Sequence, residues 1–203
     1  MLNGQKIWIR PLLEEDIDLL FAWYNDQEVN LWSSGAWPLN TLLAKNELLE
    51  KFLDDPDSGK RYGILNEDFE LIGTLGFREM NVPARSATIH ISIGNQAFWG
   101  LGYGSDALRT FIQFLFKQWN FRRLSIDTWD GNQRALKAYL KLGFQIEGRQ
   151  RQACYVLGEY RDSILLGLLR DEFFQEERHK CLCESHESPP PLKPTLKQHQ
   201  PPT

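Results

Sequence analysis

Three glycines on alternate positions, immediately before a long amphipathic helix pattern, constrain the fold of this chain more than its other features do. They lie in the segment NQAFWGLGYGSDALRTFI at residues 95–112. Gly100, Gly102 and Gly104 allow the backbone to turn tightly without interference from Cβ atoms. The first amides of a helix have no partners within it, and the helix dipole places partial positive charge there. The segment predicts either a loop that binds an anion such as phosphate or a turn in which the glycines serve geometry alone.

The glycine loop joins a strand pattern to a helix pattern. Residues 87–95, ATIHISIGN, alternate apolar and polar side chains as a half-buried strand does. One face of that strand carries Ile89, Ile91 and Ile93, and the other carries Thr88, His90 and Ser92. After the loop, apolar residues recur at helical spacing at Leu108, Phe111, Ile112, Leu115, Phe116 and Trp119. The centre of the chain is therefore predicted to be strand, glycine loop and helix.

The rest of the chain mixes strand and helix patterns, which predicts an α/β fold. Strands are expected at residues 5–10, twice within 61–80 around a turn at 66–68, at 122–129, at 144–148, and in a hairpin over 151–169 that turns at Gly158. Helices are expected at residues 13–26, at 41–53 after a cap at Asn40 or Thr41, and at 132–143 with Gly143 at its end. Residues 29–40 read as a loop.

Length and composition predict one globular domain with a tail. The 203 residues are 42% hydrophobic, enough to bury a sizeable core. Composition changes sharply near residue 178, where a segment rich in proline and polar residues begins. Such a segment cannot bury enough apolar surface to fold. We therefore expect a domain at residues 1–177 and a disordered tail at residues 178–203.

Charge and cysteine content narrow the function classes. The net charge of −4 and the lack of a basic stripe give no reason to expect nucleic-acid binding. No apolar run reaches the length of a membrane span, and no signal peptide is evident, so a cytoplasmic protein is expected. The segment HKCLCESH offers the potential metal ligands His179, Cys181, Cys183 and His186. Their spacing could hold zinc, but four potential ligands without a surrounding scaffold more often bind nothing, so we expect no metal.

Two familiar phosphate loops fit the glycine segment poorly. A nucleotide P-loop needs Lys and then Ser or Thr after its last glycine, whereas Ser105 and Asp106 follow Gly104 here. A dinucleotide-binding loop is matched in its first half, and Asp127 stands at roughly the expected distance. Its third glycine position, however, falls on Ser105, and the loop lies in the middle of the chain. A third kind of loop, which binds acyl-coenzyme A, remains.

Two motifs in order resemble the GNAT superfamily of N-acetyltransferases. WGLGYG at residues 99–104 is similar to the cofactor loop of the superfamily, although Trp99 departs from its commonest first residue. NQRALKAYLKLGF at 132–144 is similar to a second block, and the resemblance extends over residues 5–175. It is strongest for the branch with ribosomal-protein N-terminal, spermidine and aminoglycoside acetyltransferases. The resemblance implies a central, mostly antiparallel twisted sheet with a splayed central strand pair, flanked by helices.

The resemblance also implies acetyl-CoA as co-substrate. Its pyrophosphate would lie against the loop, and its pantetheine arm would pair with the preceding strand and meet the second block. The implied cofactor residues are Ile91, Ser92, Ile93, Trp99, Gly100, Leu101, Gly102, Tyr103, Gly104, Ser105, Asn132 and Lys137. For Asn132 a helix N-cap is an alternative role, and one residue can serve both.

Acetyl transfer needs a proton for the departing thiolate and a neutral amine. By resemblance Tyr139 is the general acid, with a packed core tyrosine as the alternative. Relatives often carry a glutamate base where Thr88 stands here, and His90 lies two residues on along the same strand face. An imidazole is suited to relay a proton near neutral pH. A structural histidine, and an ordered water as base, stay open.

The acceptor is expected beside the segment after the first helix. This segment offers the acids Asp26 and Glu28 near the aromatic residues Trp23, Trp32 and Trp37, a combination suited to a cation. Solvated surface is the alternative. A peptide N-terminus, polyamine, aminoglycoside or amino sugar all fit. The sequence therefore predicts an N-acetyltransferase, monomeric or homodimeric, that acts on a primary amine. The alternative is a catalytically silent acyl-CoA-binding module whose tail recruits partners.

Overall fold

The computed structural model describes residues 1–35, 45, 60–175 and 177. Several predictions lie outside these residues: Trp37, the tail at 178–203 with Cys181 and Cys183, and most of the helix predicted at 41–53. Lys45, within that predicted helix, is helical. No helix among the described residues is both long and apolar enough to span a membrane.

The strands of the described residues form one twisted sheet in the order β1-β2-β3-β4-β5-β6-β8-β7. Their bounds are β1 Leu2–Asn3, β2 Trp8–Pro11, β3 Lys60–Leu65, β4 Leu71–Asn81, β5 Ser86–Ile93, β6 Arg123–Trp129, β7 Gln145–Val156 and β8 Glu159–Leu169. Every pairing is antiparallel except that of β5 with β6. The predicted α/β class with a mostly antiparallel sheet is confirmed.

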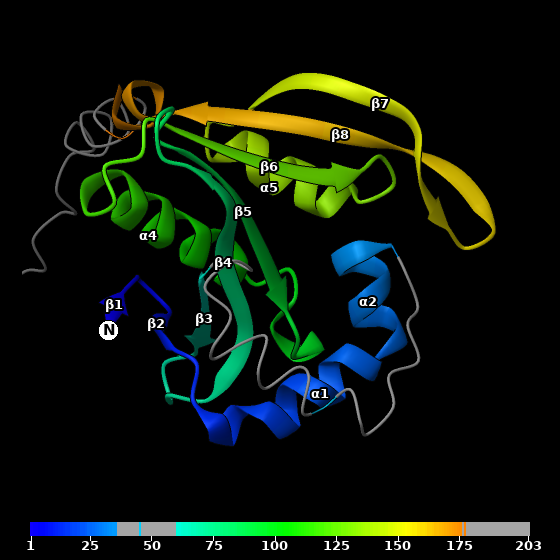
Figure 1. Cartoon of the computed structure of the whole chain (residues 1–203). Coiled ribbons are helices and arrows are strands. Elements are labelled where there is room, and N and C mark those ends of the chain that lie inside the picture. The colour runs from blue at the N-terminus through cyan, green and yellow to red at the C-terminus, as the bar shows by residue number, and fades with distance from the viewer. Residues whose placement is uncertain (36–44, 46–59, 176, 178–203) are drawn as a thin grey trace, which may run out of the picture.

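Helices cover both faces of this sheet (Figure 1). Their bounds are η1 Glu14–Asp16, α1 Ile17–Asn25, α2 Gln27–Ser34, η2 Gln96–Phe98, α4 Tyr103–Lys117 and α5 Gln133–Lys141. The start of α4 packs on the isoleucine face of β5, since a Cβ on Gly104 would lie 3.6 Å from Ile93. Trp23 of α1 lies against Gly94, which shares the opposite face with His90 and Ser92. The alternation of the strand therefore separates the two helical layers.

The core lies between the sheet and α4. Five of the apolar residues predicted on one face of this helix are at most 2% exposed: Leu108, Phe111, Ile112, Leu115 and Phe116. Phe77 of β4 meets Phe121 and the partly buried Trp119 edge to face, at centroid distances of 5.6 and 4.9 Å. Burial of this apolar face is what fixes α4 against the strands.

The central strands β5 and β6 separate soon after they begin. They pair in parallel only from Ser86 to Thr88, opposite Arg123 to Ser125. Both then continue, to Ile93 and Trp129, without further pairing to each other. Figure 1 shows them diverging. The predicted splay is confirmed, and it leaves the edge of β5 from Ile89 onward without ladder hydrogen bonds to β6.

The predicted strand at 144–148 and the first strand of the hairpin from 151 form one strand, β7, and the segment after α1 was predicted wrongly. Residues 29–34 were expected to be loop, but they belong to α2. Asp26 is the N-cap of this helix, where its Oδ1 accepts hydrogen bonds from the amides of Glu28 and Val29, each at 2.9 Å. Gly35 ends the helix with φ +72°, and its amide donates to Leu31 O at 3.1 Å. Both caps are visible in the sequence, but a weak apolar pattern between them masked the helix.

Candidate active site

A cavity of about 730 Å³ occupies the splay between β5 and β6. Its lining comes from β3 to β6, the glycine loop, α5 and the helices α1 and α2. The predicted site residues that line it are Trp32, His90, Ile91, Ser92, Ile93, Trp99, Gly100, Gly102, Gly104, Ser105, Asn132 and Tyr139. The predicted residues that do not line it are Trp23, Asp26, Glu28, Leu101, Tyr103 and Lys137. The structure thus brings most of the predicted cofactor and catalytic residues together.

The glycine loop is shaped to present backbone amides. Gly100 and Gly102 have φ angles of +76° and +92°, which side chains other than glycine rarely adopt. A Cβ on either would meet nothing within 4 Å, so both face open space. Gly102 is also the N-cap of α4 and supplies no side chain to its first amides. The amides of residues 103–105 therefore remain available to an anion at the positive end of the helix.

Basic side chains surround this loop. Lys6 Nζ donates to Leu101 O at 3.3 Å, and its own amide donates to Asp106 Oδ2 at 2.7 Å. Lys6, Arg109 and Lys141 line a smaller hollow of about 200 Å³ that reaches the start of α4. Sequence reasoning missed all three, because they come from three separate elements. Lys6 and Lys141 add positive charge beside the amides of residues 103–105, whereas Arg109 pairs with Glu177 and the acid Asp106 lines the same hollow.

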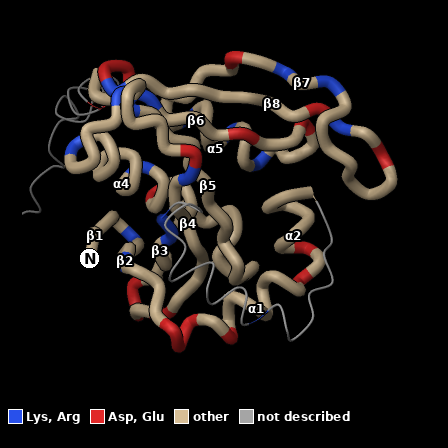
Figure 2. Tube along the Cα trace, viewed as in Figure 1, with Lys and Arg blue, Asp and Glu red and all other residues tan. Residues whose placement is uncertain are grey.

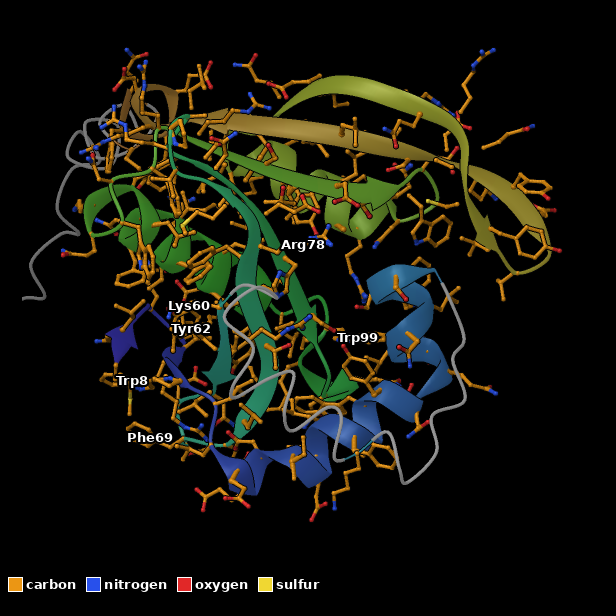
Figure 3. The ribbon with its side chains drawn as sticks, viewed as in Figure 1. Trp8, Lys60, Tyr62, Phe69, Arg78 and Trp99 are labelled. Carbon is orange, nitrogen blue, oxygen red and sulfur yellow. The ribbon has the colours of Figure 1, made fainter. Side chains whose placement is uncertain are left out.

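An arginine lies between two tryptophans in the lining of the cavity. The guanidinium of Arg134 lies 4.3 Å from the ring centroid of Trp99 and 5.7 Å from that of Trp32. Trp99 Nε1 donates to Ile93 O at 2.7 Å, which fixes the indole at the end of β5 (Figure 3). Trp32 in turn stacks on Trp129 at 5.7 Å. Cation–π contacts thus link the glycine loop, α5 and α2.

Asn132 acts as a helix cap, which was one of its two predicted roles. Its Oδ1 accepts from the Ala135 amide at 3.2 Å, at the start of α5. Its Nδ2 donates to Trp32 O at 2.8 Å and so ties α5 to α2. The side chain is buried and lines the cavity. Contact with the pantetheine arm stays a prediction.

Tyr139 faces the cavity from α5 and is 7% exposed. Burial, and to a smaller extent the charge of Asp127, raises the pKa of its phenol above the ordinary value. The phenol is therefore protonated at neutral pH. Tyr139 also belongs to the apolar core, with its ring 6.2 Å from that of Phe144. Packing and proton donation are both open to this residue.

His90 lies in a row of residues that crosses three strands. The register pairs Arg61 with Gly76 and Gly76 with His90. A Cβ on Gly76 would lie 2.9 Å from Cε1 and Nε2 of His90, so the imidazole leans over this glycine. Among the described residues neither ring nitrogen has a hydrogen-bond partner. Burial, with the charges of Arg61 and Arg78, lowers the pKa of His90 to about 3.

Arg78 and Asp127 connect the two sides of the splay. Arg78 lies opposite Thr88 on the same sheet face as His90, near the point where β5 and β6 part (Figure 3). Its Nη2 lies 3.2 Å from Asp127 Oδ1 on β6. Arg61 is largely buried, which lowers its pKa, and Tyr24 of α1 opposes this shift. Sequence reasoning missed these cavity residues, because only strand pairing places them beside His90.

The two acids predicted to attract a cationic acceptor have other positions. Figure 2 shows acidic residues along the segment that leads into α1 and at the start of α2. Asp26 caps α2 and also accepts from Gln96 Nε2 at 3.1 Å. Glu28 does not line the cavity. Of the aromatic residues predicted with them and described here, Trp32 lines the cavity and Trp23 packs on Gly94.

Comparisons with known proteins agree with this architecture. The family model described as an acetyltransferase (GNAT) domain matches residues 6–145. An uncharacterized N-acetyltransferase p20 of Bacillus licheniformis is 26% identical over 175 residues, which cover 85% of this chain and 97% of the relative. Spermidine N(1)-acetyltransferase of Escherichia coli K12 is 25% identical over 179 residues, which cover 88% and 94%.

Solved structures share the fold. Spermidine N-acetyltransferase of Vibrio cholerae, solved in complex with CoA and spermine, superposes with a TM-score of 0.76 at 20% identity, and the match covers 84% of this chain and 99% of the other. The resemblance first seen in the glycine loop and the second block is therefore confirmed by a family match over more than half of the chain. The chain belongs to the GNAT family of acetyltransferases.

Proposed function

We propose that this acetyltransferase transfers an acetyl group from acetyl-CoA to the nitrogen of a primary amine, in the cavity between β5 and β6. The observation that carries the proposal is the splay itself. It opens a cavity with anion-binding amides at the start of α4 and a protonated phenol, Tyr139, in its wall. The wall therefore combines a place for a phosphate with a proton donor.

The residues present fit coenzyme A. The amides of residues 103–105, with Lys6 and Lys141 nearby, suit the pyrophosphate. Gly100 and Gly102 leave open space where a Cβ would otherwise stand. From Ile89 onward the edge of β5 does not pair with β6, and apart from Ile93 O, which accepts from Trp99, it can offer backbone groups to the amides of the pantetheine arm, as a strand edge does for an added strand. When bound, acetyl-CoA supplies the thioester carbonyl that the amine attacks.

The place of Tyr139 in the cavity wall and its raised pKa support a role as general acid. Its phenol, kept neutral by burial, can give a proton to the departing thiolate. Amides on the free edge of β5 can polarise the carbonyl oxygen, as in oxyanion holes generally. A tyrosine so placed favours an enzyme over a silent binding module.

The lowered pKa of His90 counts against this residue as the base and leaves an ordered water as the other alternative. A histidine whose pKa has fallen to about 3 is a weak acceptor for the proton of an ammonium group. The neutral imidazole suits a hydrogen bond to substrate instead. Relatives named for spermidine make a polyamine one candidate acceptor. However, the described acids Asp26 and Glu28 do not line the cavity, so nothing in their placement supports a polycation.

The test is amine-dependent release of coenzyme A thiol, with the product identified by mass. We expect thiol release and N-acetylated amine in equal amounts across a panel that includes a dipeptide, spermidine, an amino sugar and amino acids. Thiol release without N-acetylated product would contradict the proposal, as would acetyl transfer only to hydroxyl groups. Binding of coenzyme A without any transfer would instead support the silent module.

A further inference from the structure

The sheet face that bears His90 carries charged groups that do not suit a polycation. The charged side chains that line the cavity on this face, among the described residues, are Arg61, Arg78 and Asp127. Asp127 lies 3.2 Å from Arg78, so its charge is already opposed. Arg61 and Arg78 repel each other, which helps to lower the pKa of Arg61. Among the described residues, positive charge therefore prevails on the side of the cavity away from α4.

His90 adds a hydrogen-bond donor to this positive region. It lies in the same row as Arg61, and its ring leans over Gly76 of β4, the strand that also carries Arg78. Both ring nitrogens are buried without a partner among the described residues. A neutral imidazole carries one N–H, and a buried N–H is normally paired. This N–H requires an acceptor from a ligand, and the other ring nitrogen can accept from a donor such as the amine.

We propose that the acceptor of this enzyme is an amine that carries a carboxylate, held by Arg61, Arg78 and the N–H of His90. This inference rests on the proposed function and names the substrate class of the same cavity. Guanidinium groups bind carboxylates through paired, charge-assisted hydrogen bonds. Asp127 faces Arg78 across the splay, so it offsets part of that charge and leaves the rest to the carboxylate. Amino acids and short peptides carry both an amine and a carboxylate.

A polyamine is the competing occupant. Every charged group that it brings is positive, so it would meet the two arginines without any anionic group to offset their charge. Asp127 could oppose only part of that repulsion, because it already faces Arg78. The cavity therefore favours a molecule with charges of both signs over one with positive charges alone.

The first experiment compares amines with and without a carboxylate. The pairs are glycine with methylamine, 4-aminobutyrate with propylamine, and lysine with cadaverine. We expect kcat/KM to be about tenfold or more higher for the carboxylate member of at least one pair. Equal or better turnover of the plain amine in every pair would overturn the inference and leave the proposed function intact.

If none of these amines is acetylated, a binding measurement can still test the inference. That result would count against the proposed function for these amines, and calorimetry on the protein saturated with coenzyme A would then decide the inference. Binding of glycine, 4-aminobutyrate or lysine, without binding of its plain partner, would support a carboxylate site. Binding of none of the three, or equal binding within each pair, would overturn it.

The second experiment removes the arginine. Because a carboxylate also changes the basicity of a nearby amine, a variant isolates the contribution of Arg78 better than a pair does. Arg78→Met should lower kcat/KM for the carboxylate member about tenfold or more, mainly through KM, and spare the plain amine. Arg151→Met is the matched control, an exposed arginine on β7 outside the cavity.

Variants that fail to fold are separated from variants that fail to bind. Arg78→Gln keeps a hydrogen-bond donor for Asp127, and its circular dichroism and melting temperature report whether the sheet survives. Arg61→Met repeats the test from β3 and should change KM in the same direction. An equal loss of activity toward both members of a pair, in folded protein, would show that these arginines serve only the fold.

Discussion

The two sides of the cavity are built from different parts of the chain. The side next to α4 is mostly backbone: the amides of residues 103–105 and two glycines with positive φ. The side next to α1 and α2 is mostly side chains, in a row that crosses from β3 to β5. A backbone site depends on local sequence, whereas a side-chain site depends on strand register. The first should be sensitive to added side chains and the second to removed ones.

Tyr139 lines the cavity from α5, and its loss should have the largest effect. Tyr139→Phe removes only the hydroxyl, so we expect turnover to fall by about 10² to 10⁴ while the affinity for coenzyme A is unchanged. Steady-state and single-turnover rates, with calorimetry for the cofactor, measure both. Tyr62→Phe is the matched control, because burial also raises the pKa of Tyr62 but this residue does not line the cavity. A wild-type single-turnover rate in Tyr139→Phe would leave this tyrosine a packing role only.

A substitution at Gly102 tests the backbone side of the cavity alone. Gly102→Val places a branched side chain at φ +92°, in the open space beside the first amides of α4. We expect the Kd for coenzyme A to rise well over tenfold, which is about 1.4 kcal/mol or more. Calorimetry of the folded variant gives the number.

Gly158 provides the control for backbone strain. It has φ +85° and also meets nothing within 4 Å, but it lies in the turn between β7 and β8. Gly158→Val should strain the backbone to a similar degree and leave the Kd for coenzyme A unchanged. A similar loss of affinity in both variants would mean that strain, and not obstruction of the loop, explains the first result.

The same contrast explains what the sequence could predict. The strand, glycine loop and helix at 87–117, and the cap and tyrosine of α5, are local patterns, and the structure has these elements where they were expected. The row of Arg61, Gly76 and His90 is not local, since its members meet only through strand pairing. Periodicity indicates which side chains share a face but not which strands are neighbours. The arginines of the cavity were missed for that reason.

Asp26 illustrates the opposite error, in which a residue was assigned to the site from the sequence but has another role in the structure. Its charge and its aromatic neighbours suggested a substrate site, because residues 29–34 were taken as loop. Once α2 is present, the same carboxylate is needed by two helix amides. A polar residue near aromatic side chains is ambiguous until the local backbone is known, since a cap and a ligand site use the same oxygen atoms.

The pH dependence of folding stability tests the side-chain part of the cavity through His90. Its pKa of about 3 in the fold lies below the ordinary histidine value near 6.5. Between these values the unfolded chain binds a proton that the folded chain does not, so His90 lowers stability as pH falls below about 6.5. The loss is up to about 1.4 kcal/mol for each pH unit.

His90→Gln should remove this part of the acid destabilisation. Urea unfolding of the wild type and the variant at several pH values measures it, and the carboxylates that titrate in both proteins cancel in the difference. We expect the free energy of unfolding to fall less steeply in the variant between about pH 6.5 and pH 5. Parallel curves would show that the imidazole is not held neutral against Arg61 and Arg78.

Asp26 should show the smallest effect, and it separates a cap from an acceptor site. Asp26→Ala removes both the cap and the charge, whereas Asp26→Asn removes the charge and keeps an N-cap oxygen. Because its Oδ1 accepts from two amides at the start of α2, the first change should cost about 1 kcal/mol of stability and the second far less. Urea unfolding measures this difference. Neither change should alter KM for the amine, because Asp26 does not line the cavity. A KM that rises in Asp26→Asn, at unchanged stability, would return this carboxylate to the acceptor site and favour a cationic substrate.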